Sequence, residues 1–130
     1  MIMIHQGVDM VELSQFKEVL RRNSEFVHDI FTERERTYCE SMKDPAIHFA
    51  GRFAAKESYV KALGTGFSGT GIDYLFQEIE VISSPSGKPE ISVSGWAAKM
   101  AKKRKIRQSS VSISHTANYV VASVILVGES

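Results

Sequence analysis

The chain has 130 residues, of which 43% are apolar and 24% charged, a composition typical of one soluble globular domain spanning residues 1–130. A formal net charge of +1 excludes a general attraction to nucleic acid or to a membrane surface, so local clusters of cations must bind any anion. No apolar run approaches the roughly 18 residues of a membrane span, and the first residues do not form a signal peptide. Cys39 is the only cysteine. We expect it to be a core thiol rather than a nucleophile, in a cytoplasmic protein.

Apolar periodicity and turn residues predict an α+β fold, in which an antiparallel-rich sheet packs around a long central helix. In chain order we expect a buried strand over residues 2–11, a short helix over 14–22, a helix that opens at 31–35, the long helix over 45–63, a hairpin over 78–81 and 90–93, a helix over 96–105, and a second hairpin over 111–115 and 119–127. The inward-facing side chains expected in the two flanking helices are Phe16, Val19, Leu20, Trp96, Met100 and Ala101.

Local signals mark the ends of two helices. Thr32 and Glu35 match a capping box, which accounts for Glu35, although a role as proton acceptor stays open. Pro45 lies in the first turn of the long helix, and Gly64 follows directly after its expected last residue, as a helix stop does. A glycine-rich loop is expected over residues 64–73.

The long helix carries charged pairs on two different faces, within the segment FAGRFAAKESYVKALGTG at residues 49–66. Glu57 and Lys61 are one turn apart and share a face. Arg52 and Lys56 share another face, roughly 140° from Glu57 as seen from Arg52. An ordinary core helix keeps its charges on one solvated stripe. This pattern instead indicates a helix that offers an acid and several cations to a polyanionic ligand, in more than one site.

Asp9 lies inside the first predicted strand, where a carboxylate is costly unless it is paired, hydrogen-bonded or bound to a metal. One interpretation is an acid at a strand end that accepts hydrogen bonds from a backbone turn. The other is a two-carboxylate site formed with Glu57, because magnesium prefers one or two carboxylates, several waters and phosphate oxygens.

The cations and glycines near the long helix each have two interpretations. Lys61 is either a salt-bridge partner of Glu57 or a point charge on a phosphate, and Arg52 is either stacked or solvated, or a bidentate phosphate ligand. Residues 64–66 are either a helix stop or a loop whose amides approach phosphates. His115 is either a hydrogen-bonded core histidine or part of a polar site at a strand end. The basic residues 102–107 are expected to be a solvated face, since little aromatic interleaving supports nucleic-acid binding.

Five segments together give a family resemblance that covers nearly the whole chain. They are GVDMVEL at 7–13, FTERE at 31–35, FAGRFAAKESYVKALGTG at 49–66, SGKPEI at 86–91 and SISHTANYVVASVIL at 112–126. In this order they resemble the holo-acyl-carrier-protein synthase family of small 4′-phosphopantetheinyl transferases. The resemblance implies magnesium-dependent transfer of 4′-phosphopantetheine from coenzyme A to a serine of an apo acyl carrier protein in lipid (fatty acid) biosynthesis. The other product would be adenosine 3′,5′-bisphosphate.

The resemblance also implies roles for particular residues. Asp9 and Glu57 match the family's metal ligands, and Lys61 matches the lysine on the pyrophosphate, so these three form the expected catalytic set. Arg52 and His115 match positions that bind the 3′-phosphate of coenzyme A. The remaining residues that we assign to the coenzyme A site are Lys56, Gly66, Gly87, Lys88 and Pro89, the last three near the adenine.

The expected partners are coenzyme A and an acidic apo carrier, which Lys17, Arg21 and Arg22 would attract. Members of this group resemble homotrimers with active sites between subunits, so Glu57 and Lys61 would serve one site while Arg52 reaches the next. The chain departs from the family at Ser14-Gln15, where relatives often carry a basic residue, and at residues 47–49, which lack added basic residues. A non-catalytic module that binds coenzyme A or a nucleotide is the alternative, and no nucleic acid or membrane is expected as partner.

Overall fold

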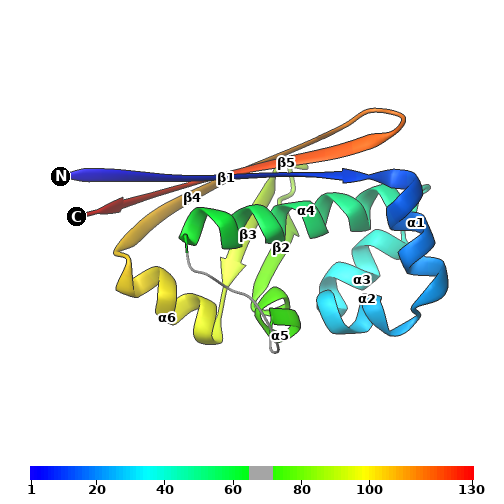
Figure 1. The fold of residues 1–130 in the computed structure, drawn as a ribbon, viewed down its shortest axis with the longest axis horizontal. Helices are drawn as coiled ribbons and strands as arrows, with labels where there is room; N and C mark the ends of the chain where they lie inside the picture. Colours follow the sequence, from blue (N-terminus) through cyan, green and yellow to red (C-terminus); the bar gives the residue numbers. More distant parts are fainter. Residues whose placement is uncertain (65–71) are drawn as a thin grey trace.

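The computed structural model of the chain describes residues 1–64 and 72–130 (Figure 1). The strands of this part are β1 (Ile2–Glu12), β2 (Ile79–Ser83), β3 (Pro89–Val93), β4 (Ile106–His115) and β5 (Tyr119–Glu129). Its helices are α1 (Leu13–Arg22), α2 (Glu25–Ile30), α3 (Glu33–Glu40), α4 (Pro45–Leu63), α5 (Ile72–Gln77) and α6 (Gly95–Lys103). The predicted α+β class, the long central helix and both hairpins are confirmed.

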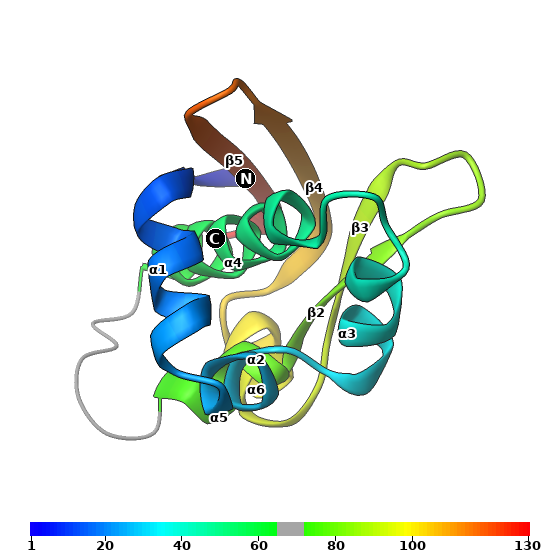
Figure 2. The same cartoon turned by 90° about the vertical axis from the view of Figure 1, so that its right-hand side faces the viewer.

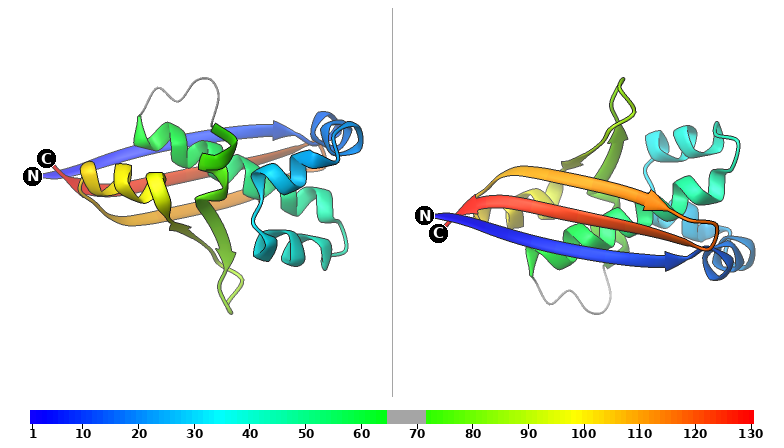
Figure 3. Two further views of the ribbon diagram at one scale, coloured as in Figure 1. Left: turned by 90° about the horizontal axis from the view of Figure 1, so that it is seen from below. Right: turned by 90° about the horizontal axis from the view of Figure 1, so that it is seen from above.

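The main sheet has three antiparallel strands in the order β1-β5-β4, and β2 pairs with β3 in a separate two-stranded sheet. α4 packs across one face of the main sheet, and Figure 3 shows no helix of the described residues on the other face. Asp9 pairs with Ala122 in the β1–β5 register. Because successive side chains of a strand point to opposite faces, Asp9 faces α4 while Val8 and Met10 face outward.

A very close approach of β1 to α4 determines where Asp9 lies. A Cβ atom placed on Gly7 would lie 2.0 Å from the carbonyl oxygen of Ser58, so only glycine fits at this crossing. Ser58 is itself buried, and its hydroxyl donates to the carbonyl oxygens of Ala54 (2.7 Å) and Ala122 (3.0 Å). The close approach at Gly7 and the hydrogen bonds of Ser58 therefore fix the position of β1 on α4, two residues before Asp9.

The predicted helix signals are present in the structure. Thr32 Oγ1 accepts from the backbone N–H of Glu35, and Glu35 Oε1 accepts from the N–H of Thr32, which confirms the capping box. Pro45 opens α4, and Gly64 ends it with a left-handed φ of 67°. The helix that carries the charged pairs, α4, therefore begins and ends where the sequence predicts.

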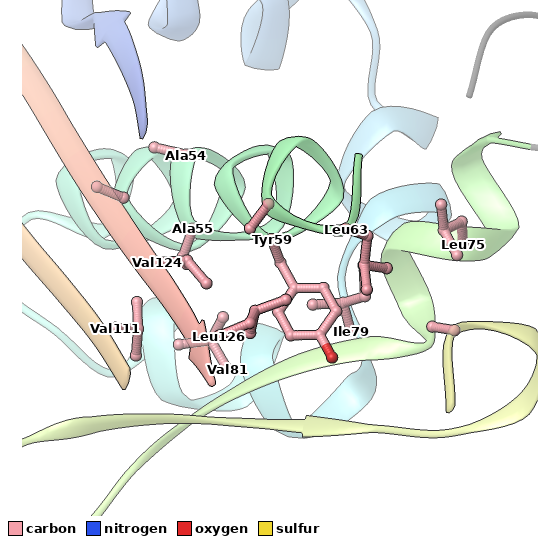
Figure 4. Close-up of a cluster of buried hydrophobic side chains, with 13 residues drawn as sticks. Ala54, Ala55, Tyr59, Leu63, Leu75, Ile79, Val81, Val111, Val124 and Leu126 are labelled. Atoms are coloured by element: carbon pink, nitrogen blue, oxygen red, sulfur yellow. The ribbon is translucent and has the colours of Figure 1, made fainter. Parts of the chain in front are cut away.

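Most of the core lies between α4 and the two sheets. In Figure 4, Tyr59 and Leu63 of α4 lie among the buried Val124 and Leu126 of β5 and Val81 of β2. A second cluster packs α1, α2 and α3 against the start of α4 and is rich in phenylalanine. Its buried members are Leu13, Phe16, Ile30, Phe31, Cys39, Phe49, Ala50, Phe76 and Val120. Burial raises the pKa of the Cys39 thiol to about 12, as expected of a core thiol.

Some expectations about burial are wrong. The first strand is not buried: Ile2, Ile4, Val8 and Met10 are between 56% and 71% exposed, because they point to the sheet face that no described helix covers. Val19 and Trp96 are exposed as well, although both were expected to face inward. The short helices α2 and α5 were not predicted, because six residues are too few for a helical period to stand out.

Among the helices of the described residues, none combines the length and the apolar character that crossing a membrane requires.

Candidate active site

An ammonium and two carboxylates meet where α4 crosses β1. Lys61 Nζ lies 2.9 Å from Asp9 Oδ1 and donates to the carbonyl oxygen of Val8 at 3.1 Å. The Asp9 side chain is only 12% exposed, whereas Lys61 is 53% exposed. One end of the Lys61–Asp9 pair is therefore sheltered by the fold, and the other can reach a ligand in solution.

Glu57 lies beside Asp9 on the helical turn before Lys61. Burial raises the pKa of Glu57 to about 7, the Asp9 charge adds to this rise, and Lys61 opposes it. A hydrogen bond between the two carboxyl groups also contributes, and it requires a proton on one of them. When both are ionised, the buried Asp9 Oδ2 has no hydrogen-bond partner. The pair therefore needs either a shared proton or a cation.

The donor set suits a hard divalent cation such as magnesium. In the residues that the structure describes, no group of three or more His, Cys, Asp or Glu side chains is placed to hold a metal. Magnesium does not need such a cage, because it is usually bound by one or two carboxylates together with waters and phosphate oxygens. The unpartnered oxygen of Asp9 and the raised pKa of Glu57 fit a two-carboxylate site for such an ion.

A second polar cluster is built on Arg52, closer to the start of α4. The guanidinium carbon of Arg52 lies 4.2 Å from the centroid of the Tyr38 ring, and Nη2 donates to Ser83 Oγ at 3.0 Å. Arg52 is only 5% exposed, and its Nε has no hydrogen-bond partner. Figure 2 shows α3 and the β2–β3 hairpin, which supply Tyr38 and Ser83, on the same side of α4. Arg52 is thus stacked and hydrogen-bonded, with one buried donor still to be satisfied.

Two histidines lie near Arg52. The ring centroid of His48 lies 5.9 Å from that of Tyr38, and burial, Arg52 and His115 all lower the pKa of His48. His115 is exposed at the end of β4, so its interpretation as a core histidine is wrong. His48 was not among the predicted site residues, although it lies one turn before Arg52 on the same helix.

A cavity of about 300 Å³ lies between β3 and β4. Lys88 and Pro89 line it together with residues 90–91 and 109–111. Pro89 pairs with Ser83, which accepts from Arg52. Gly87 adopts a φ of 87° in the turn that leads into β3. The strand that follows the predicted SGKP turn therefore begins opposite Ser83, the hydrogen-bond partner of Arg52.

Lys56 does not belong to a ligand site, contrary to the expectation. Its Nζ is fully buried and donates to Glu35 Oε1 (2.8 Å) and to the carbonyl oxygens of Phe76 (2.6 Å) and Ile79 (2.7 Å). All three ammonium donors are thus used inside the protein, and Glu35 Oε2 also accepts from the N–H of Val81. Lys56 joins α4 to α3, α5 and β2. Gly66, also assigned to the coenzyme A site, lies outside the described residues.

The three basic residues proposed for carrier docking lie on the exposed part of α1. Arg21 and Arg22 both form ion pairs with Glu18. Lys17 lines a cavity of about 370 Å³ with residues 12–14 and 117–119. The surface is therefore positive but partly neutralised by an acid of the same helix.

The two polar clusters lie toward opposite edges of the main sheet. Asp9 comes from β1 at one edge, and His115 comes from β4 at the other, with β5 between them. Glu57 and Arg52 point from α4 toward these different edges, in line with the two faces expected for the helix. The structure thus brings Asp9, Glu57 and Lys61 together, and it separately places Arg52 with Tyr38, His48 and Ser83.

Comparison with known proteins identifies the family. The family model described as the 4′-phosphopantetheinyl transferase superfamily matches residues 6–124. The holo-acyl-carrier-protein synthase of Caldanaerobacter subterraneus subsp. tengcongensis is 40% identical over 125 residues, which cover 96% of this chain and 95% of the relative. The synthase of Clostridium tetani is 41% identical over 123 residues, covering 95% and 94% of the two chains. The chain therefore belongs to the 4′-phosphopantetheinyl transferase superfamily.

Solved structures agree with this assignment. The complex of the synthase from Chronobacterium ammoniagenes with coenzyme A superposes with a TM-score of 0.86 at 30% identity, over 98% of this chain and 99% of that one. A Bacillus anthracis synthase in complex with "CoA (3′,5′-ADP)" gives a TM-score of 0.78 at 33% identity, over 99% and 100%. The expected fold and the expected class of enzyme are confirmed.

Proposed function

We propose that the chain transfers 4′-phosphopantetheine from coenzyme A to a serine hydroxyl of an apo acyl carrier protein, releasing adenosine 3′,5′-bisphosphate, as a cytoplasmic step of lipid (fatty acid) biosynthesis. The observation that carries this proposal is the meeting of Asp9, Glu57 and Lys61 in a chain of this superfamily. Transfer from a pyrophosphate requires neutralised phosphate charge and an aligned hydroxyl. A cluster with two acids and an exposed lysine suits both needs.

Asp9 and Glu57 would hold magnesium. The bound ion would supply positive charge to the phosphate oxygens of coenzyme A. Asp9 is fixed for this task, because Lys61 holds its Oδ1 and the Gly7 crossing fixes the strand, while Oδ2 stays free for the ion. Lys61 is half-exposed and would place its ammonium on the pyrophosphate as a point charge.

Arg52 and His115 would bind the 3′-phosphate of the nucleotide end. The buried Nε of Arg52 lacks an acceptor, and a phosphate oxygen would supply one in a charge-assisted hydrogen bond. The cavity beside Lys88 and Pro89 is of a size that suits a heterocyclic base. The turn at Gly87 would border that base.

The site would be completed between copies of the chain, in a homotrimer. Arg52 and Glu57 serve clusters toward opposite edges of one sheet, which favours a coenzyme A molecule shared by two chains. The exposed apolar face of β1, with Ile4, Val8 and Met10, continues onto Val121 and Ile125 of β5. Contiguous apolar surface of this kind marks interaction sites. The acidic carrier would meet Lys17, Arg21 and Arg22 on α1.

Mass spectrometry of an apo carrier incubated with coenzyme A, magnesium and this protein tests the activity. We expect the carrier to gain the mass of phosphopantetheine, and a carrier whose acceptor serine is replaced by alanine to stay unmodified. A non-catalytic module would instead bind coenzyme A in a calorimeter without modifying the carrier. If several candidate carriers remain unmodified, the proposed activity is wrong.

A further inference from the structure

His48 and Arg52 both contact the ring of Tyr38. Arg52 lies one helical turn after His48 on α4, and both side chains reach the Tyr38 ring: Arg52 over its centroid at 4.2 Å, and His48 edge-on with ring centroids 5.9 Å apart. A single tyrosine of α3 therefore holds an imidazole beside a guanidinium. This arrangement positions both for the same ligand.

Arg52 has a buried donor that no described residue of the protein satisfies. Its side chain is more than nine-tenths buried, Nη2 donates to Ser83, and Nε has no acceptor. A buried donor without a partner is destabilising, because it has lost its water and gained no acceptor in exchange. An anion beside Arg52 would remove that cost, and a phosphate would bring several acceptor oxygens to the neighbouring groups.

The charged groups around His48 oppose its protonation in the free protein. Arg52 on the same helix and His115 at the end of β4 both disfavour an imidazolium, as does burial. Only Asp44, directly before the first residue of α4, favours it. The net effect is a lowered pKa for His48. A phosphate dianion bound among these cations would reverse the sign of the local potential.

We propose that His48 completes the phosphate site of Arg52 and His115, and that it takes up a proton from solvent when a phosphate monoester dianion binds there. The protonated ring then donates to a phosphate oxygen. The inference rests on the proposed function, in which the 3′-phosphate of coenzyme A occupies this site. It adds that binding is coupled to one protonation and that His48 discriminates a phosphate monoester from an unphosphorylated ribose.

The coupling has a definite sign. The imidazolium favours the dianion, so affinity for coenzyme A rises as the pH falls through the range around 6.5 in which histidine titrates. The affinity for 3′-dephospho-coenzyme A, which lacks the monoester, does not follow this dependence. At the acid end of this range, a protein that lacks the hydrogen bond from His48 to the phosphate should bind coenzyme A roughly tenfold more weakly.

Calorimetry in buffers of different ionisation enthalpy measures the proton uptake directly. Wild-type protein is titrated with coenzyme A and with 3′-dephospho-coenzyme A near pH 6.5, and we expect greater uptake with the first. His48→Gln should lose most of that difference and bind coenzyme A roughly tenfold more weakly. His28→Gln is the matched control, because His28 is an exposed histidine of α2, and it should behave as wild type.

Two results overturn the proposal and separate it from the proposed function. If His48→Gln keeps the full uptake while the protein still prefers coenzyme A, His48 has no part in the coupling although the phosphate site stands. If wild-type protein binds both ligands equally, the phosphate site itself is wrong. Proton NMR of the four histidine rings in the wild-type protein covers the case that His48→Gln does not fold. The His48 resonance, assigned from variants of the other three, must shift to a higher pKa with coenzyme A.

Discussion

The ammonium of Lys61 and the carboxylate of Asp9 lie 2.9 Å apart and tie α4 to β1 beside Glu57. Lys61 pairs directly with Asp9, whereas burial and the Asp9 charge outweigh the effect of Lys61 on Glu57 and raise the pKa of Glu57 to about 7. Below a pH of about 7, Glu57 is therefore mostly protonated in the metal-free protein.

Glu57→Gln tests the carboxylate pair. Gln keeps the size of the side chain but cannot bind magnesium as a carboxylate does, so we expect kcat to fall by about a hundredfold or more. The free energy of unfolding should not fall, since the repulsion between Glu57 and Asp9 is removed. Carrier modification and urea denaturation measure the two effects. Glu25→Gln, on exposed α2, is the control, and full activity in Glu57→Gln would exclude Glu57 from the site.

The stability of the metal-free protein should depend on pH through Glu57. Its pKa is raised from 4.5 in the reference state to about 7 in the fold, so between these values the native state binds more protons than the unfolded state. By linkage, the free energy of unfolding then falls as the pH rises through this window and levels off above it. Denaturation at several pH values should show this decline in wild type and a smaller one in Glu57→Gln. Added magnesium should stabilise the protein most at the alkaline end, because there it does not displace a proton.

Lys56→Met tests the corrected role of Lys56. Removing one partner of a buried pair leaves Glu35 as an uncompensated charge, and we expect a loss of about 3–5 kcal/mol in unfolding free energy. The double variant Glu35→Gln/Lys56→Met should recover part of it, and Lys99→Met, at an exposed position, should lose little. A stable Lys56→Met protein that binds coenzyme A weakly would instead restore Lys56 to the ligand site.

Gly7→Ala tests the crossing of β1 and α4. The added methyl would lie 2.0 Å from the Ser58 carbonyl oxygen, so β1 and α4 must separate, at a cost of about 1–3 kcal/mol. Because Asp9 follows two residues later, magnesium-dependent activity should fall more than stability alone explains. Gly51→Ala is the milder comparison, since its Cβ meets a movable side-chain atom, Ile113 Cγ2, at 3.0 Å. Equal effects of the two changes on activity would argue against a special role of Gly7.

Mixing two inactive variants tests whether chains share sites. Glu57→Gln and Arg52→Met each damage one cluster, and subunit exchange would form some sites with both clusters intact. If each site takes one cluster from each of two chains, random mixing restores about a quarter of the sites. Activity after co-refolding, with light scattering to give the oligomeric state, measures this. No recovery in assembled mixtures would mean that each chain holds a whole site.

The sequence was sufficient to predict the features that local chemistry determines. Pro45, Gly64 and the Thr32–Glu35 box define helix ends within a few residues of chain, and the structure has all of them. Lys56 shows what the sequence alone could not predict. Its face on α4 was predicted, but whether a lysine there meets solvent or a buried acid depends on α3, which packs against it from elsewhere in the chain.

The surroundings of His48 and the exposure of β1 could not be predicted from the sequence either. His48 matters because Tyr38 of α3 and His115 of β4 come to it in space, and no spacing along the sequence reveals that. The first strand is rich in Ile, Met and Val, so its composition predicted burial. The sequence alone does not show whether a strand face is covered by another part of the chain or is left exposed.

The alternation of side chains along β1 gives neighbouring residues two unrelated tasks. Val8 and Met10 face outward with the apolar surface, and Asp9 between them faces the helix. Deleting a single residue earlier in the strand would invert this order, exchanging the acid of the catalytic cluster with the apolar residues of the outer face. The proposed catalytic role of Asp9 and the proposed self-association would then be lost by one change, so we expect this strand to tolerate substitutions far more readily than changes in length.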